Sequence, residues 1–231
     1  MDISALTRSL GYTFNNHDLL RLALTHRSAG SANNERLEYL GDSVLNFIIA
    51  AELFERCPDL HEGDLSRMRA HLVKGERLFE LASHLKLGDV LQLGTGELKS
   101  GGHHRASILA DALEAILGAI YSDGGYEACK RVVLHLYQSL LDNLPQPEAL
   151  KDPKTRLQEW LQSHQFPLPQ YEIISTHGKQ HERKFQVACM LSHIDLRLSG
   201  TGNSRRKAEQ SAASKTLELL CQQNRTNKTA S

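Results

Sequence analysis

Two carboxylates stand one helical turn apart in the segment NNERLEYLGDSVLNFIIA, residues 33–50. Asn34 is a good helix N-cap and Glu35 places a negative charge in the first turn, so the segment predicts a helix. On this helix Glu38 and Asp42 lie together at the edge of a broad apolar face, and we expect both to be partly buried. Like charges at this spacing repel and burial adds to the cost, so a cation or a proton is needed to neutralise them.

A second pair occurs in SILADALEAILGAIY, residues 107–121, where Asp111 and Glu114 are the only charged residues. The segment is otherwise apolar on nearly every side, which is typical of a buried helix. The acids share a face with Ala115 and Gly118, whose small size would let another helix or an ion approach. One such pair alone is usually a solvated surface, but two pairs on apolar helices favour a metal site. Oxygen ligands without nearby Cys or His suit Mg2+ or Mn2+ better than zinc.

The composition is that of an ordinary globular protein, with 40% hydrophobic and 23% charged residues among 231. The sequence contains no run of 18 apolar residues and no secretory leader pattern, so we expect no membrane partner and a cytoplasmic location. The cysteines are scattered without a C-x-x-C pair, which suggests neither a disulfide framework nor a zinc site and predicts reduced thiols. They are Cys57, Cys129, Cys189 and Cys221.

The net charge of zero conceals a division between two parts of the chain. Residues 1–151 carry 15 Lys and Arg against 20 Asp and Glu, whereas residues 152–231 carry 12 against 7. An acidic part could hold metal ions and a basic part could hold phosphates.

Residues 1–144 predict a domain that is nearly all helix, because apolar residues recur at helical spacing. The further helices expected there are 18–25, 64–74 with Asp64 as N-cap, 76–85 and 127–144. The glycine-rich residues 93–104 do not match a phosphate-binding loop, because Leu98 precedes Lys99 where that pattern requires glycine, and we expect a mobile loop. Residues 145–151 contain two prolines and predict an interdomain linker.

Residues 152–222 predict a second domain with the order αβββα. Pro153 suits the first turn of a helix, alternating apolar residues predict strands 171–176, 184–191 and 194–199, and Ser204 caps a last helix. Three cations in the first turn of that helix oppose its dipole, and a bound phosphate would reverse this cost. They are Arg205, Arg206 and Lys207. Residues 223–231 predict a disordered polar tail.

Four segments resemble, in the same order, the nuclease domain of the ribonuclease III family: THRS (25–28), NERLEYLGDSVL (34–45), EGDLSRMRAHLV (62–73) and ILADALEAILGA (108–119). The αβββα order with GTGNSRRKAEQSAA, residues 200–213, resembles the double-stranded-RNA-binding domain. The resemblance covers nearly the whole chain. It implies an all-α N-terminal endonuclease domain followed by an α+β double-stranded-RNA-binding domain, as in the short bacterial form.

The resemblance also implies a reaction. The expected activity is hydrolysis of duplex RNA to 5′-phosphate and 3′-hydroxyl ends, in the processing of ribosomal RNA precursors and other structured transcripts, messenger and transfer RNA included. The expected cofactor is Mg2+, for which Mn2+ can substitute, with one or two ions about 4 Å apart. By the resemblance Asp42 and Glu114 are catalytic, and Glu38, Asp111 and Glu114 are metal ligands. Glu35 could assist, although a first-turn acid needs no function to explain it. Glu62 could assist as well, although capping and surface charge explain it equally.

The resemblance assigns RNA contacts and suggests an assembly. Thr155, Gln158 and Glu159 would face one minor groove, His181 another, and Arg205, Arg206 and Lys207 the phosphates between them. Glu209 stands where such domains commonly carry a basic residue, which predicts a modest affinity. Two nearly opposite cuts need two clusters related by a two-fold axis, so we expect a homodimer. Phe47, Leu53 and Phe54 are interface candidates, with ordinary burial as the other explanation.

Three other classes of function are weighed against this one. A duplex-RNA-binding protein with an inert nuclease domain would not need all four carboxylates. A metal-dependent phosphohydrolase of small molecules would have no use for a second, basic domain. A purely structural helical protein would not place four acids on apolar helices.

Overall fold

The computed structural model of the chain describes residues 2–178 and 183–229. The chain forms two compact units, Met1–Pro147 and Glu148–Ser231, which meet within the segment that the sequence predicts as a linker. Within the described ranges, no helix combines the length and the apolar character that crossing a membrane requires.

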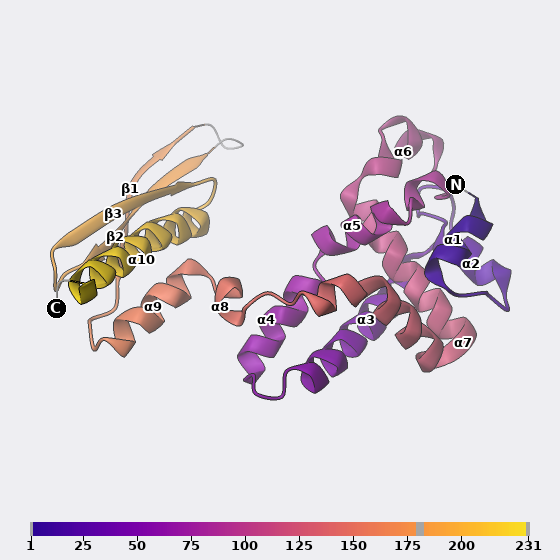
Figure 1. The fold of residues 1–231 in the computed structure, drawn as a ribbon. Coiled ribbons are helices and arrows are strands. Elements are labelled where there is room, and N and C mark those ends of the chain that lie inside the picture. Colours follow the sequence, from indigo (N-terminus) through magenta and orange to yellow (C-terminus); the bar gives the residue numbers. More distant parts are fainter. Residues whose placement is uncertain (1, 179–182, 230–231) are drawn as a thin grey trace. The chain divides into compact units, whose positions relative to one another are not determined.

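The first unit is built from helices, as the sequence predicts (Figure 1). They are α1 (Ile3–Leu10), α2 (His17–Ala23), α3 (Glu35–Arg56), α4 (Glu62–Leu72), α5 (Gly75–His84), α6 (Thr95–Lys99) and α7 (Ala106–Asp142), with 3-10 turns at Leu87–Asp89 and Gly102–His104. Helices α3 and α7 pack side by side and carry the two pairs of acids. They form the centre of the unit, and Gly41 of α3 and Gly118 of α7 are buried where the two helices meet.

Two details of this unit differ from the sequence prediction. Helix α4 begins at Glu62 rather than after Asp64, and the Asp64 carboxylate instead accepts a hydrogen bond of 2.7 Å from the Arg67 guanidinium. Residues 93–104, expected as a mobile loop, contain helix α6 and a 3-10 turn. The Gly94 N–H donates to the Ser28 hydroxyl at 2.9 Å, which ties this segment to the loop after α2.

Helix α7 combines two helices that the sequence predicts separately. The kink lies at Gly125, whose φ of +75° is accessible to glycine but costly for other residues. Beyond the kink the chain folds back on itself, and the Cys129 thiol donates to the Leu117 carbonyl at 3.5 Å. At its far end Asp142 lies 3.3 Å from the guanidinium of Arg56, at the end of α3.

Two glycines let the backbones of α3 and α7 touch. A Cβ built on Gly41 would overlap the carbonyl oxygen of Glu114, and one built on Gly118 would overlap the carbonyl oxygen of Leu37. The small size of Gly118 therefore serves a helix crossing, one of the two uses expected from the sequence. This crossing places the acids of both helices on one side of the contact.

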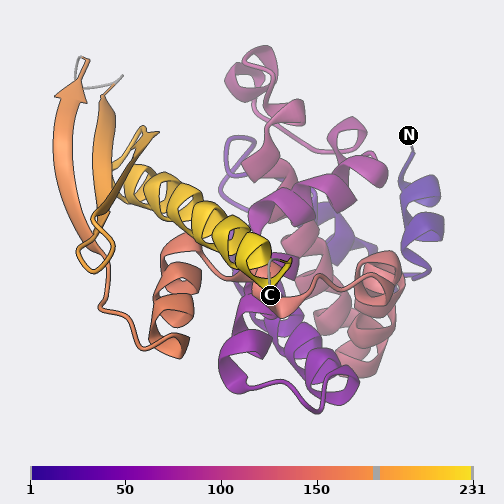
Figure 2. The same ribbon diagram turned by 60° about the vertical axis from the view of Figure 1, so that its left-hand side comes forward.

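The second unit has the predicted order αβββα (Figure 1). Its elements are α8 (Pro147–Leu150), α9 (Pro153–Ser163), β1 (Gln170–His177), β2 (Lys184–Leu191), β3 (Leu196–Gly202) and α10 (Arg205–Thr229). The strands form an antiparallel sheet in the order β1-β2-β3, with Val187 opposite both Ile173 and Gly200. Figure 2 shows α10 along one face of this sheet, where it closes a core with α9. The core residues are Leu157, Leu161, Cys189, Leu191, Ala212, Ala213, Leu217 and Leu220.

Strand β3 and helix α10 differ from the prediction, and β3 extends to Gly202 rather than ending at Ser199. Strand β3 begins at Leu196 rather than at Ile194, because Asp195 has a φ of +48° and ends the turn after β2. Helix α10 continues to Thr229, whereas a disordered tail is predicted from residue 223. The tail contains no glycine or proline to stop a helix that the core already nucleates. Residues 230–231 lie outside the described part.

Candidate functional site

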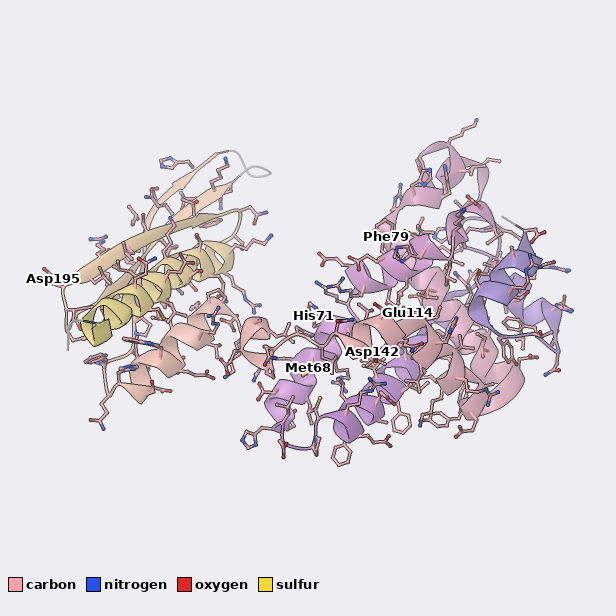
Figure 3. The ribbon with its side chains drawn as sticks, in the orientation of Figure 1. Met68, His71, Phe79, Glu114, Asp142 and Asp195 are labelled. Carbon is pink, nitrogen blue, oxygen red and sulfur yellow. The ribbon has the colours of Figure 1, made fainter. Side chains whose placement is uncertain are left out.

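Three of the four predicted carboxylates converge. Glu38 of α3 meets Asp111 and Glu114 of α7, with one oxygen from each residue within 4.8 Å of the others. All three side chains are partly buried. Figure 3 labels Glu114 on α7 at its crossing with α3. The crossing therefore assembles a cluster from residues more than 70 positions apart in the sequence.

Nearby positive charges only partly offset the charge of this cluster: Arg27 acts on Glu38, and His26 and Arg27 act on Asp111, but burial outweighs them. Burial, and then the charges of Asp42, Asp111 and Glu38, raises the pKa of Glu114 to about 8. Burial raises the pKa of Asp111, and burial followed by the charges of Asp111 and Glu35 raises that of Glu38. Among the described residues, no hydrogen-bond donor or ion-pair partner contacts the three carboxylates. Three converging oxygen donors whose charge is only partly compensated fit a hard divalent cation.

The fourth carboxylate, Asp42, lies differently from its prediction. It is exposed rather than partly buried, and its Oδ1 accepts a hydrogen bond of 2.9 Å from the Asn46 amide. The contact with α7 is centred on Gly41, so the next residue already turns toward solvent. Asp42 is not part of the oxygen cluster, but after burial its charge has the largest effect on the pKa of Glu114. It lies close to the cluster without belonging to it.

The two acids predicted to assist lie in different places. Glu35 borders the same pocket as Glu38 and is 3.6 Å from Arg27. Glu62 borders another pocket with Phe54 and accepts a hydrogen bond of 2.7 Å from the Ser66 hydroxyl. The fold of one chain therefore brings Glu35, but not Glu62, to the pocket of the carboxylate cluster.

The pocket beside the carboxylates has a volume of about 280 Å3 and is also lined by the cations Arg27 and Arg105, which are not among the predicted site residues. Its further lining residues are His26, Arg27, Asn34, Glu97, Arg105, Ser107 and Ile108. Arg105 is held by Glu97 at 2.7 Å. His26 and Arg27 belong to the motif THRS, so the sequence could have indicated them. Glu97 lies in the segment expected to be a mobile loop, and Arg105 directly follows that segment. Carboxylates and cations in one pocket suit a metal ion and an anionic substrate together.

Asn34 occupies the N-cap position of α3, as predicted, but its side chain forms no capping hydrogen bond. Its side chain is 3% exposed and donates to the Ala23 carbonyl at 3.3 Å, without capping the helix. The Asn33 carboxamide instead accepts from the Glu35 N–H at 3.1 Å. Because Ala23 is the last residue of α2, the hydrogen bond from Asn34 joins the end of α2 to the start of α3, next to the pocket.

In the second unit, most of the predicted RNA contacts lie around one open groove of about 740 Å3 between α9 and α10. It is bordered by Asp152, Lys154, Thr155, Gln158, Arg205, Arg206, Glu209 and Gln210. Lys207 is exposed on the same helix start, where the Ser204 hydroxyl accepts its N–H at 3.2 Å and so forms the predicted cap. Glu159 is paired with Lys151 at 2.8 Å and borders a different pocket. His181 lies outside the described residues.

Two family models match the chain in the order of its two units. A ribonuclease-III-like model matches residues 16–140, and a double-stranded RNA binding motif matches residues 153–220. Ribonuclease 3 of Nitrosococcus oceani is 55% identical over 224 residues, 96% of each chain, and that of Vibrio cholerae is 54% identical over 218 residues, 94% of this chain and 97% of the other.

The nuclease domain of ribonuclease III from Campylobacter jejuni has a similar structure, with 44% identity and a TM-score of 0.59. The match covers 60% of this chain and 97% of that domain, and thus concerns the first unit. Family models, relatives and fold agree with a helical first unit and an αβββα second unit. The chain belongs to the ribonuclease III family and is an endoribonuclease with a double-stranded-RNA-binding domain.

Proposed function

We propose that the chain hydrolyses phosphodiester bonds of double-stranded RNA to 5′-phosphate and 3′-hydroxyl ends, with Mg2+ as its cofactor and Mn2+ as an effective substitute. The observation that carries this proposal is the convergence of Glu38, Asp111 and Glu114, at a place where burial raises the pKa of all three carboxyl groups. The oxygen-only donor set suits Mg2+ and Mn2+.

In this proposal the three clustered carboxylates bind the metal ion, and the nearby acids Asp42 and Glu35 assist the reaction. Glu38, Asp111 and Glu114 hold the metal, which when bound lowers the pKa of a water molecule and stabilises charge on the departing 3′ oxygen. Asp42 is exposed, is held by Asn46, and orients the attacking water by accepting a hydrogen bond from it. Glu35 assists at the edge of the pocket, whereas a role for Glu62 requires a second chain because its own pocket is a different one.

The second unit binds the duplex by shape and charge. Thr155, Gln158 and Glu159 on α9 face one minor groove, and the start of α10 binds phosphates. This assignment is supported by the open groove that Thr155 and Gln158 share with Arg205 and Arg206. The role of His181 at the other minor groove stays a prediction.

We further propose that two copies of the chain form a homodimer. Helix α3 exposes three large apolar side chains, with Tyr39 79%, Phe47 61% and Phe54 72% exposed, whereas Leu53 is buried in its own core. Exposed aromatic residues on one helix favour a protein interface. The nuclease domain from Campylobacter jejuni has a region involved in dimer formation. Two clusters related by a two-fold axis can cut both strands.

The setting proposed for this activity is the cytoplasm, with ribosomal RNA precursors and other structured transcripts as substrates. The four cysteines are free, and Cys129 and Cys189 are buried thiols, as a reducing compartment favours.

The proposal is tested with purified chain and a uniformly labelled RNA duplex, with and without Mg2+, beside a Glu114→Gln variant and a DNA duplex. We expect metal-dependent cleavage of RNA alone, 5′-phosphate ends, and a variant that binds RNA without cutting it. RNA binding without cleavage by the unaltered chain would instead support an RNA-binding protein with an inert nuclease unit.

A further inference from the structure

The groove of the second unit contains an acid among its cations. Glu209 on α10 is only 9% exposed. One of its oxygens lies 2.6 Å from the Lys154 ammonium on α9, and the other lies 2.8 Å from the Arg205 guanidinium one turn earlier on α10. Both cations border the groove that holds the predicted RNA contacts. Two of its positive charges therefore already have a counterion inside the protein.

The contacts around Glu209 fix this arrangement. Burial raises the pKa of Glu209, but the hydrogen bonds from Lys154 and Arg205 outweigh it and lower the pKa below its ordinary value, so the carboxylate is charged at neutral pH. The Lys154 ammonium also lies 4.4 Å from the centre of the Tyr171 ring. The backbone N–H of Lys154 donates to the side-chain oxygen of Gln210 at 3.0 Å. Lys154 is thus held on three sides.

The neighbouring cations are arranged differently. Arg206 and Lys207 are exposed, and neither forms an ion pair within the part of the chain that the structure describes. A phosphate can bind them without displacing a carboxylate. A phosphate at Arg205 or Lys154 has to approach the Glu209 charge, and like charges repel more strongly in a partly desolvated groove than in water.

We propose that Glu209 is an internal counterion that limits the affinity of this groove for duplex RNA by occupying Lys154 and Arg205, and that Arg206 and Lys207 bind the phosphates. The inference rests on the proposed contact between this groove and RNA. It explains the modest RNA affinity expected from the sequence by the pairing of Glu209 with Lys154 and Arg205.

A purely structural role for Glu209 makes the opposite prediction. Glu209 also joins α9 to α10, so a structural residue, when altered, would weaken the domain and with it the binding of RNA. Glu209→Gln separates the two roles, because glutamine has nearly the same size and keeps an oxygen that accepts from Lys154, but carries no charge. The matched control is Glu218→Gln, which removes one charge from the same helix at a carboxylate that accepts from the Ser214 hydroxyl at 2.9 Å.

The experiment measures binding of a labelled RNA duplex to the full-length chain in EDTA, so that no cleavage occurs, over a series of KCl concentrations. We expect Glu209→Gln to bind about five- to ten-fold more tightly at low salt, with a slope of log Kd against log salt that is steeper by about one to two. Glu218→Gln should stay within about two-fold of the unaltered chain, because its charge lies away from the groove.

A second pair of variants tests the same inference without altering Glu209. Arg206→Gln should lower the salt slope by about one, whereas Arg205→Gln should leave it nearly unchanged, because only Arg206 binds a phosphate. Equal losses of slope in the two variants, or weaker binding by a folded Glu209→Gln chain, would overturn the inference. Failure of the unaltered chain to bind duplex RNA would overturn the proposed role of the groove itself.

Discussion

The crossing of α3 and α7 predicts that a single methyl group added at Gly118 is strongly destabilising. A Cβ there would overlap the carbonyl oxygen of Leu37 and lie 3.0 Å from the backbone nitrogen of Gly41. Both are backbone atoms of α3, so no side-chain rotation relieves the overlap and the helices must separate. Overpacking of a core costs about 1–3 kcal/mol, and for a clash with backbone we expect a loss near the upper end, about 3 kcal/mol.

The assay is urea unfolding of the full-length Gly118→Ala chain, observed by two signals. The single tryptophan, Trp160, lies in the second unit, so its fluorescence follows that unit, while far-ultraviolet circular dichroism follows mainly the helical first unit. With a slope of about 2 kcal/mol per molar urea, a loss of 3 kcal/mol lowers the circular-dichroism midpoint by about 1.5 M. The Trp160 transition should not move.

The control is Gly75→Ala. Gly75 begins α5, and a Cβ there would meet no atom within 4 Å, so its effect should stay within about 0.5 kcal/mol. Because Glu38 comes from α3 and Glu114 from α7, Gly118→Ala should also weaken the binding of Mn2+. An unchanged circular-dichroism midpoint in Gly118→Ala would refute the close crossing.

Three further predictions follow from single residues. Tyr137→Phe should stabilise the first unit by about 1 kcal/mol in the same urea assay, because the buried Tyr137 hydroxyl has no hydrogen-bond partner among the described residues; a loss of stability would contradict this. Burial raises the pKa of Asp123, but hydrogen bonds from the Tyr12 hydroxyl and two backbone N–H groups outweigh it and lower the pKa below its ordinary 3.8. Asp123 therefore stabilises the fold above its ordinary pKa of 3.8, and this contribution is lost as the pH falls through the lowered pKa. Asp123→Asn should flatten the stability profile over this acidic range, and identical profiles would exclude this role. Asp42→Asn should slow cleavage yet keep the calorimetric affinity for Mn2+ within about three-fold, since Asp42 lies outside the oxygen cluster; a loss as large as that of Glu114→Gln would place Asp42 among the ligands.

The sequence predicts features that local patterns determine. Helical spacing places Asp111 and Glu114 on an apolar helix, alternation marks strand Lys184–Leu191 with its observed bounds, and Ser204 caps the last helix. Each depends on neighbours within a few positions, where propensity and periodicity act. These features include the αβββα order of the second unit and three members of the carboxylate cluster.

Features that depend on tertiary contacts were not predictable in the same way. Asn33 and Asn34 are equally good caps, and only the contact with Ala23 decides that Asn34 is buried. The exposure of Asp42 depends on where α7 crosses α3.

The pairing of Glu209 with Lys154 also joins helices far apart in the sequence. A pattern within one segment contains no information on its partner, which is why the sequence suggested a weak RNA contact at Glu209 but not its cause.

Binding of Mn2+ to the full-length chain without RNA, measured by titration calorimetry, tests the central claim most directly. The variants are Glu38→Gln, Asp111→Asn and Glu114→Gln, with Glu127→Gln as a control that removes one exposed charge from α7. The carboxylate cluster predicts that each of the first three loses at least about ten-fold in affinity while the control binds like the unaltered chain. Unchanged affinity in all three variants would contradict it.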